Sequence, residues 1–498
     1  MYNLDTKILL VYPVCPGTFW SFRRALKFIS KRAVMPPLGL ITVASMLPKE
    51  WEKRLIDQNV MQLKDSDLEW ADYVFVSAMT IQRQGVKELI ERCHKIGKKI
   101  VAGGPLFTAE REKFDEIDFL VLDEAETTLA PFLADLKAGN PKHIYTSEEK
   151  PNLSNTPLPS WELITQKYYS TMPIQLSRGC PYDCEFCDII TLFGRNQRMK
   201  SKELIINELE SLYQSGWRGG VTLADDNFIS KKTILKNELL PAMIEWMHKR
   251  KYPFSFMAEV SINLADDDEL MKMMIEAGFD VLFVGIETPD ELSLKECNKI
   301  PNRGRDLLAS AKKMQQFGFV VDAGFILGFD NDDETTFARL QEFIEHSGIV
   351  TAMVGLLNAP RGSRLHERLQ KEGRLLPEED NVGDNTSVWT NFVPKMKLEP
   401  LIKGYKSVQE KLYSAKPYYA RVQKFFKNYK PPKRKPMAFH FYYIKALLKT
   451  MLIIGILKKD RRYFWKLVAW SLFRKPTLLP LVIRYAIYQV HFAEVFGL

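Results

Sequence analysis

The stretch "LSRGCPYDCEFCDII", residues 176–190, places three cysteines within eight positions and decides how the chain is interpreted. Cys180, Cys184 and Cys187 follow the spacing C-x3-C-x2-C, which lets one short loop present three thiolates to one face of a metal cluster. Structural zinc usually takes four ligands in two separated pairs, and the nearest histidines lie far away in this sequence. Three protein ligands leave one metal position open, which is useful only if another molecule binds there.

The first 145 residues alternate short β-branched runs with helix-length intervals, a pattern that predicts a doubly wound domain with a parallel sheet. Ligands bind such a domain at the carboxyl ends of its strands. The expected strands are "KILLVYP" (7–13), "KRLIDQN" (53–59), "YVFVSAM" (73–79), "KKIVAGG" (98–104) and "DFLVLDE" (118–124).

A second alternating series follows a polar, proline-containing linker, and it predicts a partial (β/α)6 barrel of the TIM type, short of the eight units needed for closure. Beyond it the alternation stops, and helical segments with mixed apolar and basic residues are expected. The predicted α/β organisation is therefore a Rossmann-like domain over 1–145, a linker over 146–170, a barrel over 171–375 and a helical region over 376–498.

The net charge of +9 is unevenly distributed along the chain. Residues 421–498 hold 17 Lys/Arg and 2 Asp/Glu, a local charge of +15 that leaves −6 for the first 420 residues. Basic residues interleaved with aromatic and aliphatic ones suit the anionic inner face of a membrane. A helical cap over the barrel with a solvated basic face is the alternative, and nucleic acid is not expected as a partner. The first residues lack a signal-peptide layout, which predicts a cytoplasmic protein, peripheral on the membrane, with reduced thiols.

The segment "CPYDCEFC" resembles the cluster loop of the radical S-adenosylmethionine (SAM) superfamily. This resemblance implies that Cys180, Cys184 and Cys187 hold a 4Fe–4S cluster, that SAM chelates the open iron, and that one electron cleaves SAM to a 5′-deoxyadenosyl radical. Phe186 would cover the cluster from water. The alternative is a zinc or ferredoxin-type site completed by Cys15 or Cys297.

Later strand ends match further positions of the same superfamily. Asp225 or Asp226, in "LADDNF", fits the place of a group that binds the amino group of SAM, although the common Gly-Gly-Glu is absent and Asp226 or Asn227 could instead cap a helix. Glu287, in "VGIETP", matches the position that reaches the ribose hydroxyls. In "AGFILGF", Ile326 would pack on the adenine. Two glycines of that segment would let the backbone approach the ligand: Gly324 and Gly328.

The first domain looks like the cobalamin-binding unit that precedes many radical SAM barrels, on the segments "PPLGL", "LIDQN", "VSAMTIQ" and "VAGGP". The resemblance implies that Ser77 bonds the buried nucleotide tail and that Gly103 and Gly104 make room for it. The D-x-H-x-x-G pattern that supplies a histidine to cobalt is absent, so Asn59, water or nothing faces the metal. A nucleotide-binding domain is the rival interpretation, but "AGGP" is no dinucleotide fingerprint.

The combined layout most resembles cobalamin-dependent radical SAM methylases, including hopanoid methylases. This implies methyl transfer from methylcobalamin to an unactivated carbon of a hydrophobic, lipid-like or isoprenoid substrate, with a flavodoxin- or ferredoxin-type electron donor. Tyr182 and Arg361 or Arg364 are candidate pocket residues, with surface arginines as the alternative. Two other functions stay open: a radical rearrangement, cyclisation or oxidation without methyl transfer, and a non-catalytic membrane-associated iron–sulfur protein.

Overall fold

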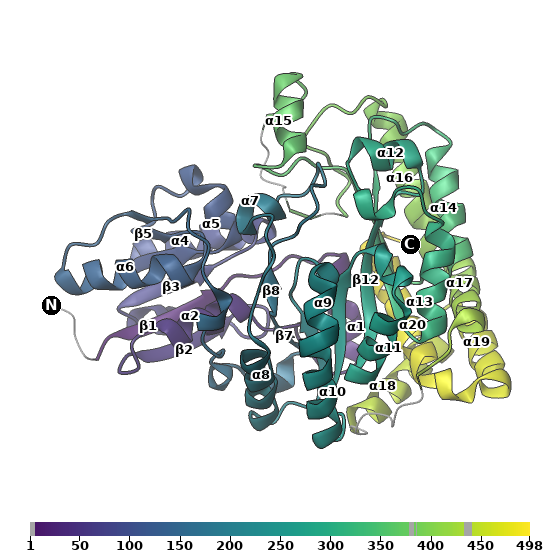
Figure 1. The fold of residues 1–498 in the computed structure, drawn as a ribbon, viewed down its shortest axis with the longest axis horizontal. Helices are drawn as coiled ribbons and strands as arrows, with labels where there is room; N and C mark the ends of the chain where they lie inside the picture. Colours follow the sequence, from purple (N-terminus) through teal and green to yellow (C-terminus); the bar gives the residue numbers. More distant parts are fainter. Residues whose placement is uncertain (1–4, 378–382, 385, 433–440) are drawn as a thin grey trace.

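The computed structural model describes residues 5–377, 383–384, 386–432 and 441–498, with no account of the side chains of 441–443. Two parallel sheets and a helical carboxyl-terminal region make up this part of the chain (Figure 1). The predicted α/β fold class is confirmed. Its two alternating series form separate sheets because each series has its own run of buried β-branched strands.

The first sheet has six parallel strands in the order β2-β1-β3-β4-β5-β6. The five predicted strands are present, and a short sixth strand follows them. The strands are β1 (Lys7–Tyr12), β2 (Glu52–Asp57), β3 (Tyr73–Ser77), β4 (Lys99–Gly103), β5 (Phe119–Val121) and β6 (Ile144–Tyr145). The accompanying helices are α1 (Arg23–Phe28), α2 (Leu38–Met46), α3 (Asp65–Trp70), α4 (Arg83–Ile96), α5 (Pro105–Ala109) and α6 (Ala125–Ala138).

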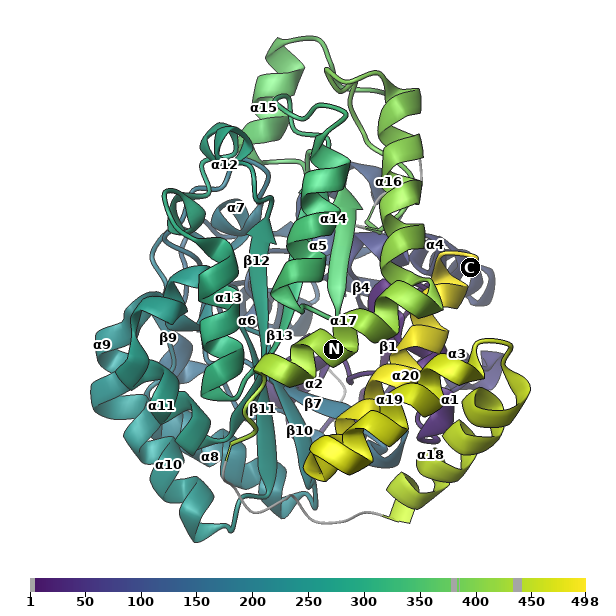
Figure 2. The same cartoon turned by 90° about the vertical axis from the view of Figure 1, so that its right-hand side faces the viewer.

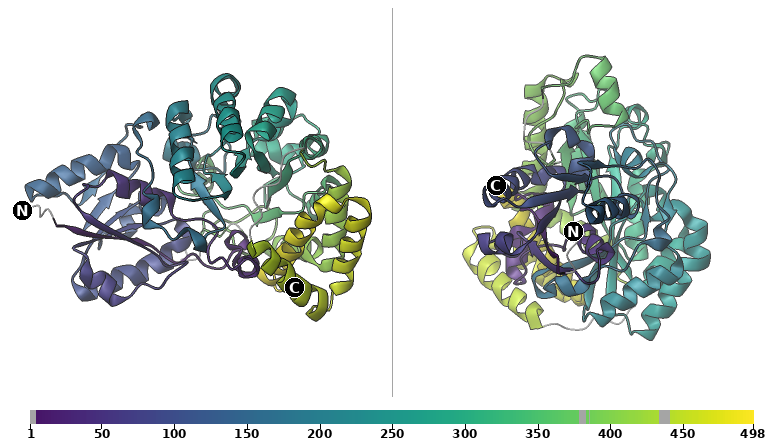
Figure 3. Two further views of the ribbon diagram at one scale, coloured as in Figure 1. Left: turned by 90° about the horizontal axis from the view of Figure 1, so that it is seen from below. Right: turned by 90° about the vertical axis from the view of Figure 1, so that its left-hand side faces the viewer.

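The second sheet is a half-barrel of six parallel strands in the order β14-β13-β12-β11-β10-β7. Figure 3 shows its helices on the outside and the first domain beside its open edge. The strands are β7 (Thr171–Ile174), β10 (Gly219–Leu223), β11 (Phe254–Val260), β12 (Phe279–Glu287), β13 (Val320–Leu327) and β14 (Ala352–Leu356), with a separate hairpin of β8 (Ser177–Arg178) and β9 (Arg198–Met199). The helices are α7 (Ile189–Phe193), α8 (Lys202–Gln214), α9 (Lys232–Ile234), α10 (Leu240–Lys249), α11 (Asp268–Ala277), α12 (Glu291–Glu296), α13 (Leu307–Phe317), α14 (Thr336–Ser347) and α15 (Arg364–Lys371).

Helices α16–α20 gather along one side of the half-barrel (Figure 2). They are α16 (Leu398–Tyr413), α17 (Ala415–Asn428), α18 (Phe441–Leu452), α19 (Arg461–Arg474) and α20 (Leu479–Val495), and a π-helical turn, η11 (Ile453–Leu457), continues α18. Helix α20 reaches the first domain, where Phe492 stacks on Phe19 at 4.3 Å between ring centroids and the imidazole of His491 lies 2.9 Å from the Phe19 carbonyl oxygen. The helical region therefore fills the gap that six strands leave open. Within the described residues, no helix has both the length and the apolar character needed to cross a bilayer.

Buried ion pairs tie the first domain to the two strands of the hairpin that flanks the cysteine loop. Arg178 pairs with Glu124 at 2.7 Å and with Glu126 at 2.9 Å, and Arg198 pairs with Glu124 at 2.8 Å. Glu124 is 4% exposed, so its charge depends on these two arginines for compensation. The ion pairs fix the start of the cysteine loop relative to the strand ends of the first domain.

Candidate functional site

One cavity of 3320 Å³ lies between the two sheets and the carboxyl-terminal helices. Ser77 and Gly103 of the first domain, Cys187 and Glu287 of the half-barrel, and Ile487 of α20 all line it. Pockets for a single small ligand measure about 300–1,000 Å³. The cavity therefore has room for more than one ligand, and it joins the carboxyl ends of both sheets.

The three predicted cluster ligands lie on the loop between β8 and α7. The Cys180 amide donates to the Gly194 carbonyl at 3.3 Å, and the Cys187 amide donates to the Cys184 carbonyl at 3.1 Å, which folds the loop back on itself. All three thiols are free. Burial raises the pKa of each thiol, that of Cys187 to about 12, so a cation is needed to hold them as thiolates.

Zinc would need a fourth protein ligand, and the sequence offers Cys15 and Cys297 for that place. Across the described ranges, no three His, Cys, Asp or Glu side chains are placed to hold a single metal ion. Of the two alternative fourth ligands, Cys297 is buried below the loop with its thiol 3.8 Å from the Leu294 carbonyl oxygen, whereas Cys15 belongs to the first domain.

Glu287 and Lys299 form a buried ion pair beside the cysteines. The Lys299 ammonium donates to Glu287 Oε1 at 2.6 Å, and it lies 5.9 Å from the centroid of the Phe186 ring. Burial alone would lower the pKa of Lys299, but the charges of Glu287 and Cys184 raise it overall. Glu287 has a φ of 63°, a left-handed conformation that costs a non-glycine residue free energy and clusters at functional sites. The predicted Phe186 and Glu287 both line the cavity.

Asp225 and Asp226 follow β10 as predicted, but both face the protein. Asp225 accepts hydrogen bonds from the Ser177 hydroxyl and from the Leu176 amide, the latter at 3.2 Å, and Asp226 accepts from the Gly179 amide at 2.8 Å. Burial raises the pKa of Asp225 to about 7 and that of Asp226 to about 6. Both carboxylates position the segment that enters the cysteine loop, and their contact with SAM stays a prediction.

Glu259 of β11 is a cavity residue that the sequence analysis did not identify. Its side chain is accessible from the cavity, and desolvation by the protein around that cavity, followed by the charges of Asp226 and Asp225, raises its pKa to about 7. Lys299 and Glu287 also act on it. A single acidic residue within the apolar run "FSFMAEV" was the available signal.

The predicted residues of β13 have separate roles. Ile326 lines the cavity and packs with Phe329 and Leu357 in an apolar cluster. A Cβ at Gly324 would lie 3.1 Å from the Phe283 ring, so this glycine makes room for an aromatic side chain. Gly328 has a φ of +105°, and its amide donates to Asp332 at 2.7 Å. The glycine at 328 is therefore required by the turn that ends the strand.

The four residues predicted to contact cobalamin all line the cavity: Asn59, Ser77, Gly103 and Gly104. A Cβ at Gly103 would lie 2.5 Å from the Val121 carbonyl oxygen, and one at Gly104, where φ is +94°, would lie 2.4 Å from Ser77 Oγ. Only glycine permits this close approach of β4 to Val121 and Ser77, while room for a ligand at these glycines stays a prediction. These strand ends fit a flat ligand laid across them.

Asn59 is less available than the sequence implies. Its amide oxygen accepts from the Cys15 amide at 2.8 Å, and its amide nitrogen donates to Asp57 at 2.7 Å and to the Pro13 carbonyl at 3.2 Å. These bonds hold the side chain within its own domain. If cobalamin lies here, Asn59 shapes the loop beneath it.

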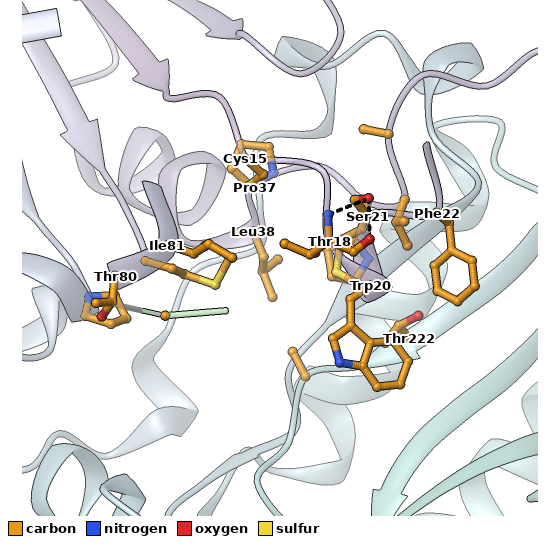
Figure 4. Close-up of a pocket in the computed structure, with 18 of the residues that line it drawn as sticks. Cys15, Thr18, Trp20, Ser21, Phe22, Pro37, Leu38, Thr80, Ile81 and Thr222 are labelled. Carbon is orange, nitrogen blue, oxygen red and sulfur yellow. Dashed lines mark hydrogen bonds between the residues drawn. The ribbon is translucent and has the colours of Figure 1, made fainter. Parts of the chain in front are cut away.

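Trp20 extends from the first domain into the half-barrel. Its indole nitrogen donates to the Met353 sulfur at 2.9 Å, its ring meets Phe283 edge-on at 5.3 Å, and Figure 4 places it beside Thr222. The turn that carries it is held by Ser21, whose hydroxyl donates to the Thr18 carbonyl at 2.6 Å. No motif predicted this residue, because only the fold brings it into the barrel.

The two candidate arginines pair with acidic residues of the protein. Arg361 pairs with Glu112 of the first domain, and Arg364 pairs with Asp183 of the cysteine loop at 2.9 Å. The Tyr182 hydroxyl accepts from the Asn263 side chain at 3.1 Å. These contacts hold the domains and the loop in place, while a role in substrate binding stays a prediction.

Comparisons with known proteins agree with this arrangement. Family models match a B12 binding domain at residues 29–133, the radical SAM superfamily at 174–344 and a domain of unknown function (DUF4070) at 363–497. The chain is 38% identical over 494 residues to an uncharacterized methyltransferase of Synechocystis sp., covering 98% of this chain and 91% of that protein. It is 36% identical over 380 residues to the hopanoid C-2 methylase of Rhodopseudomonas palustris, covering 75% and 72%.

The fold is similar to that of the cobalamin-dependent radical enzyme OxsB with aqua-cobalamin and SAM bound, with a TM-score of 0.61 at 16% identity over 99% of this chain and 80% of that one. At this identity the likeness concerns the fold alone. The family assignment rests on the two relatives that are 38% and 36% identical over most of this chain, and it confirms the predicted family. The chain belongs to the radical SAM methyltransferases that carry a B12-binding domain, enzymes whose cofactors are a 4Fe–4S cluster, SAM and cobalamin.

Proposed function

We propose that the enzyme methylates an unactivated carbon of a hydrophobic, lipid-like or isoprenoid substrate. One observation carries this proposal: the cavity continues from the cysteine loop and the cobalamin-domain strand ends to an apolar wall formed by α18 and α20. The residues of that wall are Leu447, Leu479, Leu481, Ile483 and Ile487. A large apolar ligand would bury part of its surface against these side chains.

When bound, the cluster and SAM supply a carbon radical that abstracts hydrogen, and cobalamin carries the methyl group. Cys180, Cys184 and Cys187 would hold the cluster, Glu287 would bind the ribose of SAM, and Phe186 would exclude water from this end. Lys299 pairs with Glu287 and compensates its charge in a largely buried place. The face formed by Ser77, Gly103 and Gly104 would hold cobalamin across the cavity.

The hopanoid C-2 methylase of R. palustris supports a polycyclic isoprenoid as the kind of substrate. A one-electron donor of the flavodoxin or ferredoxin type is a proposed partner, since SAM cleavage needs an electron. The inner face of the membrane is the other proposed partner, on the basic character of the last part of the chain.

The test is an anaerobic assay of the protein reconstituted with iron, sulfide and cobalamin, given SAM, a reductant and a lipid extract. Deoxyadenosine together with S-adenosylhomocysteine and a methylated lipid is the expected result. Deoxyadenosine without S-adenosylhomocysteine in the presence of the lipid extract would favour rearrangement, cyclisation or oxidation. Neither product from protein with an intact cluster would contradict the proposal.

A further inference from the structure

Helix α18 and the turn η11 present one apolar row to solvent. Ile444, Leu448, Leu452 and Ile456 follow one another at intervals of four residues, which places them along one helix face. Their exposed fractions are 37%, 64%, 53% and 58%, and the adjoining Leu457 is 68% exposed. We call these five residues the apolar row. Exposed apolar side chains in such a line mark a surface that another phase or molecule covers.

The other face of the same segment is fixed in the protein. Ala446, Thr450 and Ile454 are buried, and the Lys449 ammonium donates to the Lys27 carbonyl of α1 at 2.9 Å. The segment is therefore docked on the fold through one face. Because the opposite face is buried against the protein, the apolar row points toward solvent.

Basic residues accompany the apolar row throughout. Residues 444–462 contain six Lys/Arg and a single acidic residue, Asp460. The basic residues are Lys445, Lys449, Lys458, Lys459, Arg461 and Arg462. Basic residues near an anionic membrane are attracted to it, and long lysine side chains keep their charges at the interface while apolar neighbours insert. A second copy of the same face would be repelled by its charge, which favours anionic lipid as the occupant.

The cavity reaches this segment from the inside. Ile444, Ala446 and Leu447 of α18 line the cavity, as do Lys27 of α1 and Leu481 of α20. Ile444 therefore belongs both to the cavity wall and to the exposed row. These three helices pack against one another beside this part of the cavity, and Figure 2 shows α1, α18 and α20 side by side. We call the place where they meet, at the Ile444 end of the apolar row, the mouth.

We propose that the apolar row docks on an anionic lipid surface and that the mouth between α1, α18 and α20 faces the bilayer, so that an apolar substrate enters the cavity directly from the membrane. The inference rests on the proposed lipid-like substrate and assigns its route. A surface-bound enzyme of this kind needs no spanning helix, because interfacial helices insert only their apolar face.

The docking surface is tested by sedimentation of the full-length holoenzyme with vesicles. Wild type should sediment with vesicles of phosphatidylcholine and phosphatidylglycerol at 3:1, sediment far less with pure phosphatidylcholine, and be released by about 0.5 M salt. Leu448→Glu/Leu452→Glu should weaken binding at least tenfold, since two apolar side chains lose their burial. Equal binding of this variant and wild type, or no binding of wild type to the anionic vesicles, would overturn the docking surface.

The matched control is Leu292→Glu/Leu398→Glu, which adds the same two charges at exposed leucines of α12 and α16, 60% and 45% exposed. It should bind vesicles as wild type does. Iron content and circular dichroism of both variants establish that they are folded.

The mouth is tested by photocrosslinking. A benzoylphenylalanine at position 444 should form adducts with lipid acyl chains in the anionic vesicles, whereas the same group at position 292 should not. Absence of adducts at 444 would refute the mouth. Neither of these two tests requires turnover. A negative result in either one is therefore distinguishable from failure of the methyl-transfer proposal, which is tested by the formation of deoxyadenosine and S-adenosylhomocysteine.

Discussion

Lys299 holds Glu287 at 2.6 Å in a space that the glycine at 285 leaves open, since a Cβ there would lie 2.5 Å from the same carboxylate oxygen. The pair joins the end of β12 to the segment after α12, next to the cysteine loop. Both side chains are largely buried, with 14% of the lysine and 9% of the glutamate side chain exposed. Such a pair is costly to break, because the remaining charge stays buried.

Lys299→Met should therefore lower the free energy of unfolding by about 3–5 kcal/mol. Glu287→Gln in the same background should restore part of the loss, which a double-mutant cycle from denaturant unfolding would measure. Additive effects of the two substitutions would contradict a direct interaction.

SAM binding, measured by equilibrium dialysis, should weaken about tenfold or more in Glu287→Gln alone if its carboxylate accepts a hydrogen bond from the ribose hydroxyls.

Glu124→Gln should weaken the connection between the two domains. This carboxylate compensates both Arg178 and Arg198, so its loss should cost about 3–5 kcal/mol of unfolding free energy. The matched control is Glu52→Gln, whose pair with Arg54 is about half exposed on both sides and should cost less than about 1 kcal/mol. The ratio of deoxyadenosine to S-adenosylhomocysteine should also rise, because the cysteine loop and the cobalamin face would no longer be held in register. Equal stability of the two variants would show that the buried pairs do not join the domains.

The spacing of the cysteines and the alternation of strands were enough to predict the family, the two sheets and the position of the three cysteines on one loop. These features are local in sequence: three cysteines within eight positions, and short β-branched runs separated by helix-length intervals. The direction of Asp225 and Asp226, the pairing of Lys299 with Glu287 and the insertion of Trp20 depend on contacts between distant segments. Helical periodicity predicted the carboxyl-terminal helices but not that α20 would fill the open side of the half-barrel.

Stability should fall as the pH rises toward neutrality because of Asp322. Burial raises the pKa of this carboxyl from its ordinary value near 3.8 to about 7, although Thr351 and Arg484 oppose the shift. Between those values the folded state binds more protons than the unfolded state, so its stability is present below about pH 4 and declines through about pH 7. Asp322→Asn should remove this decline, and its melting temperature should exceed that of wild type at pH 8 by more than at pH 5. Parallel melting curves for the two proteins from pH 5 to 8 would contradict the prediction.

Cys184→Ala should abolish deoxyadenosine formation, whereas Cys297→Ala should retain it. The two thiols are close in space and similarly buried, 9% and 2% exposed, so a general effect of losing a buried thiol should appear in both variants. Only Cys184 belongs to the C-x3-C-x2-C loop, and its removal leaves two protein ligands for the cluster. Iron and sulfide content and the charge-transfer absorbance of the reconstituted proteins would be measured beside the nucleoside product. Loss of the cluster in Cys297→Ala would identify a fourth cysteine ligand, which would occupy the iron needed for SAM and would remove the basis for radical chemistry at this site.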